Sequence, residues 1–372
     1  MPKAPPLAAL HPIERGHLDV LTDGVGIMQH AIGSTPDPAH GYCVDDVARA
    51  LQVDLLHART IGWERVANRA WRNLRFLSDA FDDMTGRFRN FRSVDGTWLP
   101  GKASEDSQGR AMLALGETIA MAPDERMVKA ASALFVDALP QAQRVEALRA
   151  RSSVLLGCEG VLQRAPTPEA EAAYRYLATK LRSTFQVDAD ADWPWPEPIL
   201  TYENALPIRA LITAGQRLGS RSMVERGLAL LDWLIVAQTA KAGHLSPVGN
   251  GWWRADGEKS QFDQQPIEAT ALILTAELAY GITGDARYRD AMERAYGWFL
   301  GRNDLGAEIA DPARGAGRDG LTPTGANTNE GAESTLMWLM ALEHIRALRH
   351  QEAQMDTPAA TDETLATAGS RR

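Results

Sequence analysis

The sequence has little of what would assign it to several common classes of protein. Only two of its 372 residues are cysteine, Cys43 and Cys158, which is too few for a disulfide framework in a chain of this length. No segment reaches the roughly 20 apolar residues needed to span a bilayer, and the first ten residues, MPKAPPLAAL, lack the unbroken apolar run of a secretory signal. We therefore expect a cytoplasmic protein without a membrane partner.

Motifs for metals and cofactors are missing as well. None of the eight histidines falls in an HExxH pattern, and the two cysteines lie far apart, so the sequence predicts no metal site. It has no GxGxxG and no P-loop, so we expect no nucleotide and no other cofactor. The formal net charge of -9 argues against nucleic acid as the main partner.

What the sequence does have is apolar residues at helical spacing over most of its length. Residues 1–16 are predicted to be an extended lead, 17–350 a single domain, and 351–372 a disordered tail without an apolar face. Within the domain we expect twelve helices, at about 17–31, 45–60, 63–81, 104–121, 124–138, 141–158, 167–185, 204–218, 220–238, 266–281, 285–300 and 329–349.

Polar and acidic residues recur just before alternate helices, in GYCVDD, SEDS, TYEN, FDQQ and TNEG. In the first turns that follow, Arg or Glu precedes a small residue, at Arg49, Arg110, Arg209, Glu268 and Glu333. Most intervals are near 60 residues, whereas the interval from Arg110 to Arg209 could contain a further copy, for which Glu146-Ala147 is a candidate. This pattern predicts a helical hairpin repeated six times around a ring.

Long loops precede these alternate helices, whereas the opposite turns, such as Ile61-Gly62, are short. Residues 84–99 alternate enough to predict a β-hairpin, with its turn at Asp95-Gly96. We therefore expect an all-α protein with short β-hairpins in the loops of one rim, where functional residues would gather.

The segments GYCVDDVARAL, LTYENALPIRAL, FDQQPIEATAL and NTNEGAESTLMWL resemble those of the six-hairpin glycosidase superfamily, over about residues 17–349. This resemblance implies an (α/α)6 barrel whose inner helices carry acidic residues at their N-terminal ends, along a carbohydrate-binding groove. The superfamily contains hydrolases, unsaturated-uronyl hydrolases, lyases and sugar epimerases. A glycoside hydrolase acting on an oligo- or polysaccharide is the main prediction.

Glycoside hydrolysis needs a protonated carboxyl group and a second carboxylate. We predict Asp46 and Glu203 for these roles, with Asp106 and Glu330 as further candidates. Glu203 follows aromatic residues, which would favour a protonated acid, and Asp46 adjoins a second carboxylate. For any one of them, capping of a helix is the alternative explanation.

The rest of the predicted groove consists of polar and aromatic residues in the same loops. Flat indole faces suit the apolar faces of pyranose rings, although burial in a core is the more common use of tryptophan. The predicted substrate-binding residues are Tyr42, Asp45, Trp98, Glu105, Trp193, Trp195, Tyr202, Trp252, Trp253, Asp263, Gln264 and Gln265.

Three alternatives stay open. A sugar epimerase or isomerase would use paired histidines as acid and base, and only His244 and His40 fall in predicted rim loops. A carbohydrate lyase would use Tyr42 or Tyr202 as its base. A non-catalytic glycan-binding protein linked to polysaccharide biosynthesis would keep the groove without the catalytic pair. The oligomeric state, the sugar and the linkage are left open.

Overall fold

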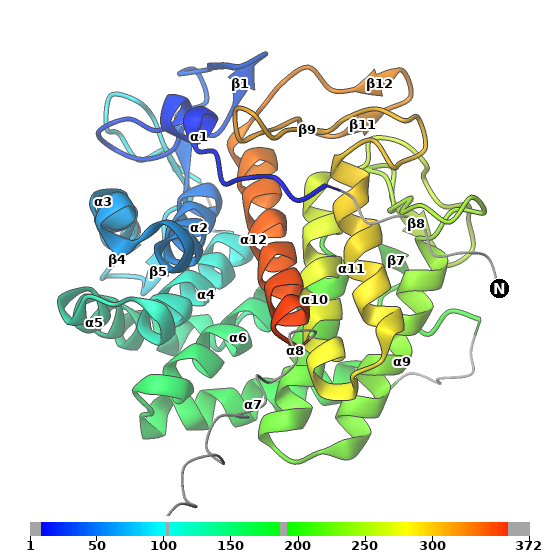
Figure 1. Ribbon diagram of the computed structural model, residues 1–372. Coiled ribbons are helices and arrows are strands. Elements are labelled where there is room, and N and C mark those ends of the chain that lie inside the picture. Colours follow the sequence, from blue (N-terminus) through cyan, green and yellow to red (C-terminus); the bar gives the residue numbers. More distant parts are fainter. Residues whose placement is uncertain (1–8, 102–103, 187–191, 356–372) are drawn as a thin grey trace, which may run out of the picture.

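The computed structural model describes residues 9–101, 104–186 and 192–355, and the structural statements below refer to these residues. Most of them are helical (Figure 1). The helices are α1 (Gly16–Leu21), α2 (Val44–Ile61), α3 (Trp63–Ala80), α4 (Glu105–Met121), α5 (Glu125–Ala142), α6 (Leu148–Arg164), α7 (Pro168–Thr184), α8 (Ala205–Arg217), α9 (Arg221–Ala237), α10 (Pro266–Thr283), α11 (Ala286–Phe299) and α12 (Ala332–Met355).

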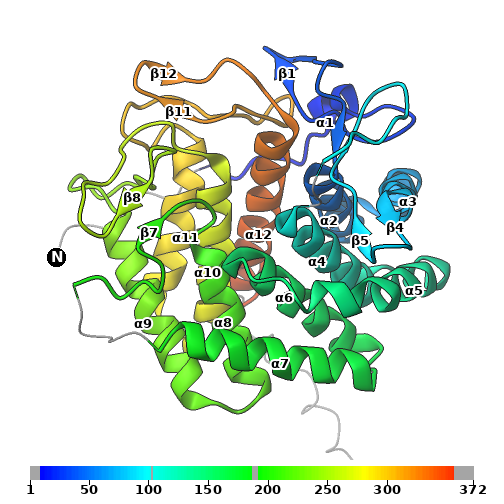
Figure 2. The same cartoon turned by 180° about the vertical axis from the view of Figure 1, so that it is seen from behind.

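The even-numbered helices form an inner ring in which each packs on the next, and α12 packs on α2 to close it (Figures 1 and 2). The helices α3, α5, α7, α9 and α11 each pack outside the inner helix that precedes them, and the short α1 packs on α12. Consecutive helices of a pair are joined by short turns, as at Gly62, whose φ of 92° favours glycine. The predicted (α/α)6 barrel is confirmed.

The strands are all two residues long and lie in the segments that lead into inner helices, so the all-α class is also confirmed. They form the antiparallel pairs β1–β2 (Ala31–Ile32, Thr35–Pro36), β3–β6 (Tyr42–Cys43, Phe91–Arg92), β4–β5 (Phe81–Asp82, Arg87–Phe88), β7–β8 (Ile199–Leu200, Trp253–Arg254), β9–β10 (Ala310–Asp311, Ala316–Gly317) and β11–β12 (Leu321–Thr322, Gly325–Ala326). The predicted hairpin at 84–99 is instead divided between β5 and β6, and the Asp95-Gly96 turn closes a single bridge between Arg92 and Trp98.

The first predicted helix, 17–31, is wrong beyond Leu21. Asp23 accepts hydrogen bonds from the backbone N–H groups of Val25 and Gly26, at 2.7 and 3.1 Å, and so forms a turn in place of a second helical turn. The chain then enters the β1–β2 hairpin rather than continuing as an outer helix.

The predicted sixth helix, 141–158, begins too early. The Glu105 carboxylate accepts hydrogen bonds from the N–H groups of Glu146 and Ala147, at 2.9 and 2.7 Å, just before α6 begins at Leu148. The further copy of the repeat is therefore α6, with Arg149-Ala150 in its first turn rather than Glu146-Ala147.

Glycines allow α4 and α6 to touch backbone to backbone. A Cβ added to Gly157 would lie 2.4 Å from the carbonyl oxygen of Met112, and one added to Gly116 would lie 2.0 Å from that of Gly157. Neither neighbour is a flexible side chain, so the two helices would have to separate.

We therefore expect Gly157→Ala to lower the free energy of unfolding by about 1–3 kcal/mol, the usual cost of overpacking a core. Urea denaturation followed by circular dichroism measures it. The matched control is Gly281→Ala, since Gly281 lies in α10 with nothing within 4 Å of an added Cβ. The control should be neutral or more stable, because alanine is the better helix former. Equal effects of the two substitutions would contradict the expected role of the close contact.

In the described part of the chain, no helix combines the length and the apolar character needed to cross a membrane. The predicted tail begins five residues too early, because α12 continues to Met355. Residues 356–372, the rest of that predicted tail, lie outside the described residues.

Candidate active site at the N-terminal ends of the inner helices

The first two turns of α2 carry a buried network of charges. Asp46 accepts hydrogen bonds from Arg49 Nη1 and Cys43 Sγ, both at 3.0 Å. The other nitrogen of the same guanidinium, Nη2, lies 2.9 Å from the Glu333 carboxylate in the first turn of α12. Arg49 therefore ties together the starts of the two helices at which the ring closes.

The start of α4 is tied in the same way to the start of α8. Arg110 donates to both carboxylate oxygens of Glu203, with Nη1 at 2.8 Å from Oε1. Both side chains are buried. Glu203 has a φ of 49°, so the backbone turns sharply just before α8 to bring its carboxylate to Arg110.

A third arginine, Arg149 in α6, holds the other side of the α8 entrance. It donates to the Tyr202 carbonyl oxygen and to Asn204 Oδ1, the latter at 3.0 Å. Asn204 Nδ2 in turn donates to Glu268 Oε2 of α10 at 3.1 Å. The Tyr202 hydroxyl donates to Asp106 at the start of α4. The entrances of α4, α6, α8 and α10 thus form one polar network.

These contacts, together with the charge interactions of Asp45, connect eight residues at the starts of inner helices. We refer to them as the mouth cluster. Asp45 interacts through charge with both arginines of the cluster and with Asp106. Arg49 interacts in the same way with Glu203. The mouth cluster consists of Asp45, Asp46, Arg49, Asp106, Arg110, Tyr202, Glu203 and Glu333.

Two adjacent carboxyl groups in this cluster have an unusual pKa. Burial raises the pKa of Asp45 to about 6, although Arg49 and Arg110 oppose the shift, and burial likewise raises the pKa of Asp46 to about 6 against the effect of Arg49. Asp46 is 3 % exposed and fully engaged by its partners. Asp45 is half-buried, and its Oδ1 has no hydrogen-bond partner. Of the two, Asp45 is the carboxyl group with a buried oxygen that lacks a hydrogen-bond partner.

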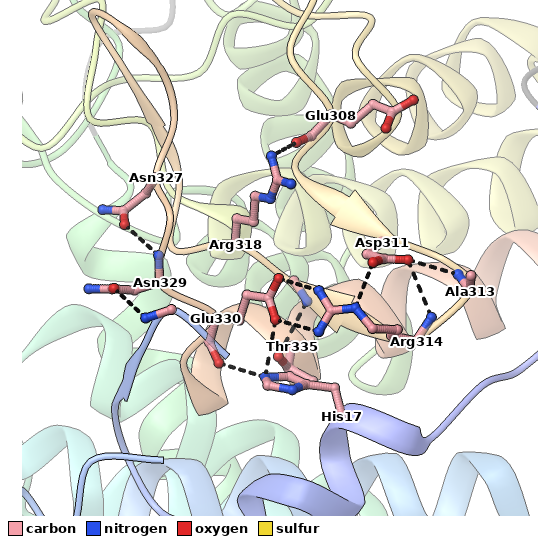
Figure 3. Close-up of polar contacts among 12 residues, drawn as sticks. His17, Glu308, Asp311, Ala313, Arg314, Arg318, Asn327, Asn329, Glu330 and Thr335 are labelled. Atoms are coloured by element: carbon pink, nitrogen blue, oxygen red, sulfur yellow. Dashed lines mark hydrogen bonds and ion pairs between the residues drawn. The ribbon is translucent and has the colours of Figure 1, made fainter. Parts of the chain in front are cut away.

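Glu330, Glu105 and Asp263 are the predicted acidic residues that lie outside the mouth cluster. Glu330 accepts hydrogen bonds from Nη1 and Nη2 of Arg314, with Nη1 at 2.9 Å from Oε2, and its backbone oxygen contacts His17 Nε2 at 2.8 Å (Figure 3). It joins α1 and the β9–β10 hairpin to the start of α12. Glu105 accepts hydrogen bonds from the backbone before α6, as described above. The contacts of Glu330 and of Glu105 are therefore those of structural residues.

The predicted tryptophans are mostly packed within the protein. Trp195 is 1 % exposed against Phe185, and Trp193 forms a cluster with Trp233 and Trp253. The guanidinium groups of Arg89 and Arg92 each lie 5.5 Å from the centre of the half-buried Trp98 ring. Only Trp252 of the predicted set presents a large surface, with 41 % of it exposed.

The remaining predicted residues divide in a similar way. Tyr42 is buried and donates its hydroxyl to Asp23, and Gln264 is buried between Trp298 and Asp304. Asp263 is exposed in a turn with a φ of 59°, and Gln265 precedes the first residue of α10.

The arginines and Glu333 were missing from the residues predicted for the groove. The sequence contained a signal for most of them, because Arg49, Arg110 and Glu333 are members of the repeated Arg/Glu-small pairs. No group of three or more potential metal ligands occurs in the described residues.

Glu268, another member of those pairs, is a buried acid at the edge of this network. Burial raises its pKa to about 7, although hydrogen bonds from Asn204 and Gln238 oppose the shift, and its Oε1 has no partner. An unfolded glutamate has a pKa near 4.5. Unfolding therefore releases a proton between these two pH values, so the contribution of Glu268 to stability decreases as the pH rises through them.

We accordingly expect Glu268→Gln to raise the free energy of unfolding by about 1–3 kcal/mol at pH 8, and by much less at pH 5. Urea titrations at both pH values measure the difference. The control is Glu64→Gln, at an exposed position in α3. A gain that is the same at both pH values would contradict the argument from burial.

Comparison of the sequence with protein-family profiles and with curated proteins finds no match. Solved structures do match the fold. A sugar epimerase from a ruminal bacterium has a TM-score of 0.69 at 12 % identity, covering 88 % of this chain and 94 % of that chain.

The cellobiose 2-epimerase of Spirochaeta thermophila has a TM-score of 0.66 at 15 % identity, covering 88 % and 92 %. The GH76A α-1,6-mannanase of Salegentibacter has a TM-score of 0.60 at 12 % identity, covering 90 % and 97 %. These similarities extend over almost the whole barrel and include both epimerases and hydrolases. The chain is an (α/α)6 barrel, the fold that it shares with these epimerases and this mannanase.

Proposed function

We propose that the protein is a glycoside hydrolase whose reaction takes place at the mouth cluster. The observation that carries this proposal is Asp45, a half-buried carboxyl group with a pKa of about 6 and a buried oxygen without a hydrogen-bond partner, among further carboxylates. A carboxyl group whose pKa is raised toward neutrality, beside an ionised one, is the pair that glycoside hydrolysis requires. The substrate is an oligo- or polysaccharide, and the location is cytoplasmic.

In this proposal Asp45 is the general acid. It transfers its proton to the glycosidic oxygen as the bond from that oxygen to the anomeric carbon breaks. Asp106, oriented by the Tyr202 hydroxyl, is the second carboxylate and faces the positive charge that develops at the anomeric carbon. The oxygen of a water molecule finally bonds to that carbon, and its proton returns to a carboxylate.

We propose roles for Asp46 and Glu203 that differ from those predicted from the sequence. Each accepts hydrogen bonds from an arginine, which stabilises the ionised carboxylate. We propose that they are positioning residues: they hold Arg49 and Arg110 beside Asp45, which limits how far burial raises the pKa of that acid.

The test is incubation of the purified protein with a panel of glycans, including α- and β-linked mannans and glucans, followed by mass spectrometry. Hydrolysis adds one water, about 18 mass units, for each bond cleaved, and new reducing ends appear. Cleavage that requires Asp45 supports the proposal. Binding of a glycan without any product would instead indicate the non-catalytic alternative.

A sugar epimerase is the second candidate, because the structure brings together two histidines that lie ten positions apart. The rings of His30 and His40 are in edge-to-face contact, with their centres 4.6 Å apart, at the rim near Asp319. An imidazole of this pair could remove a proton from a sugar carbon as a base and, once the sugar has turned, return it as an acid to the other face. His244, the other rim histidine, is bound instead by Asp304 at 3.1 Å.

Deuterium separates the two functions. An epimerase acting in D2O replaces a carbon-bound hydrogen by deuterium. Its product therefore gains about one mass unit without cleavage of a glycosidic bond. That product should disappear in His30→Asn and persist in Asp45→Asn if the histidine pair is responsible. Cleavage without deuterium on carbon would exclude the epimerase.

A further inference from the structure

A cavity of about 410 Å³ lies along the axis of the barrel, beyond the mouth cluster. Arg49, Arg110 and Glu203 form its boundary toward the mouth, and it extends to Arg59 and Gln216 near the C-terminal ends of α2 and α8. All six inner helices line it. Its volume falls in the range of small-molecule sites, about 300–1,000 Å³, and none of the functions above uses it.

Most charged groups that line this cavity have partners. Glu117 accepts a hydrogen bond from Gln52 at 2.8 Å, and Glu277 lies 2.6 Å from His344 Nδ1. Glu159 accepts two hydrogen bonds from Arg217, at 2.5 and 2.7 Å. The carboxylates of the cavity wall are therefore already engaged within the protein.

Arg209 is different. It lies on the second turn of α8, lines the cavity and is half-buried, yet it has no hydrogen bond or ion pair with any described residue. Glu277 interacts with Arg209 through charge alone, because the hydrogen bond of that carboxylate is with His344. Arg59, also without such a partner, stands exposed at the far end of the cavity.

A guanidinium that is partly removed from bulk water and has no hydrogen-bonded carboxylate is costly, and its planar set of donors matches the two oxygens of a carboxylate or phosphate. Around Arg209 the wall offers hydroxyl and amide groups from Thr213, Gln163 and Gln216. It also offers an apolar surface, which includes Leu206 and Leu274. A ligand complementary to this wall has one anionic group and several hydroxyl groups on a compact frame.

We propose that the axial cavity binds a small hydroxylated anion, such as a sugar carrying a phosphate or carboxylate, with Arg209 as the residue that binds the anionic group. This inference does not depend on the reaction proposed for the mouth cluster, because the proposed reacting groups, Asp45 and Asp106, do not line the cavity.

The test is isothermal titration calorimetry of the full chain in phosphate-free buffer of low ionic strength. Glucose 6-phosphate and glucuronate represent the two anionic groups, and glucose is the neutral probe. We expect at least one anionic sugar to bind at least about tenfold more tightly than glucose, since a charge-assisted hydrogen bond is worth at least that factor.

Arg209→Gln should weaken that binding by about 10- to 100-fold, for the same reason. Arg175→Gln, on the exposed face of the outer helix α7, is the matched control and should bind as the wild type does. Glu277→Gln should bind the anion more tightly, because the nearest carboxylate loses its charge. That opposite sign distinguishes a binding role from general damage to the fold.

Asp45→Asn should retain the binding, which would place the ligand outside the mouth cluster. The proposal is overturned if no anionic sugar binds at millimolar concentration, if glucose binds equally well, or if Arg209→Gln binds the anion as the wild type does.

Discussion

Replacing Asp45 by asparagine should lower the rate of glycan cleavage by about 10²- to 10⁴-fold, the usual contribution of a general acid. Binding of the glycan should change little, because asparagine has nearly the same shape and can still accept and donate hydrogen bonds. The protonated form of Asp45 is the active one and its pKa is raised to about 6. The rate of the wild type should therefore decrease as the pH rises through that value.

The measurement is kcat and KM of wild type and variant between pH 4.5 and 8, once the panel has identified a substrate. Asp137→Asn, at an exposed position in the outer helix α5, is the matched control and should have wild-type kinetics. A kcat for Asp45→Asn within threefold of wild type would rule Asp45 out as the acid. Loss of kcat with Asp106→Asn and not with Asp45→Asn would transfer the role to Asp106.

Arg110→Met should lower the free energy of unfolding by about 3–5 kcal/mol, which is the range for removing one partner of a buried ion pair. The reason is that Glu203 would remain buried without the guanidinium that donates to both of its oxygens. Adding Glu203→Gln to this variant should restore much of the loss, because the uncompensated charge is then removed as well.

Urea denaturation of the two single variants and the double variant gives the coupling energy of the pair. Arg175→Met breaks an exposed pair with Glu171 in α7 and should cost less than about 1 kcal/mol. A loss from Arg110→Met no larger than that of the control would show that Arg49, the other guanidinium near Glu203, compensates for it.

The helices could be predicted because each leaves a local pattern in the sequence. The turn at Gly62 and the proline at the start of α10 mark their boundaries directly. The entrance of α6 could not be found in this way, since the carboxylate that shapes it is that of Glu105, about 40 residues earlier. The first predicted helix, 17–31, was too long because apolar residues continue at helical spacing into a turn and a hairpin.

The location of the mouth cluster could be predicted from the sequence, but the pairing of its residues could not. That the starts of the inner helices would meet follows from the repeat alone. That Glu203 would be paired with Arg110 does not, since the two lie 93 positions apart in the sequence. The same limit applies to Trp195, whose position before α8 suggests a sugar platform, whereas its burial depends on Phe185.

The closure of the ring between α12 and α2 also determines how the molecule can come apart. In an open solenoid each repeat depends only on its neighbours, so terminal repeats can fray while the middle stays folded. Here the last inner helix packs on the first, and Arg346 of the last inner helix donates to the His11 carbonyl oxygen, before α1, at 3.0 Å. The barrel has no terminal repeat from which unfolding could begin, and opening any one helix pair uncovers two others. Loss of structure should accordingly be a single cooperative event.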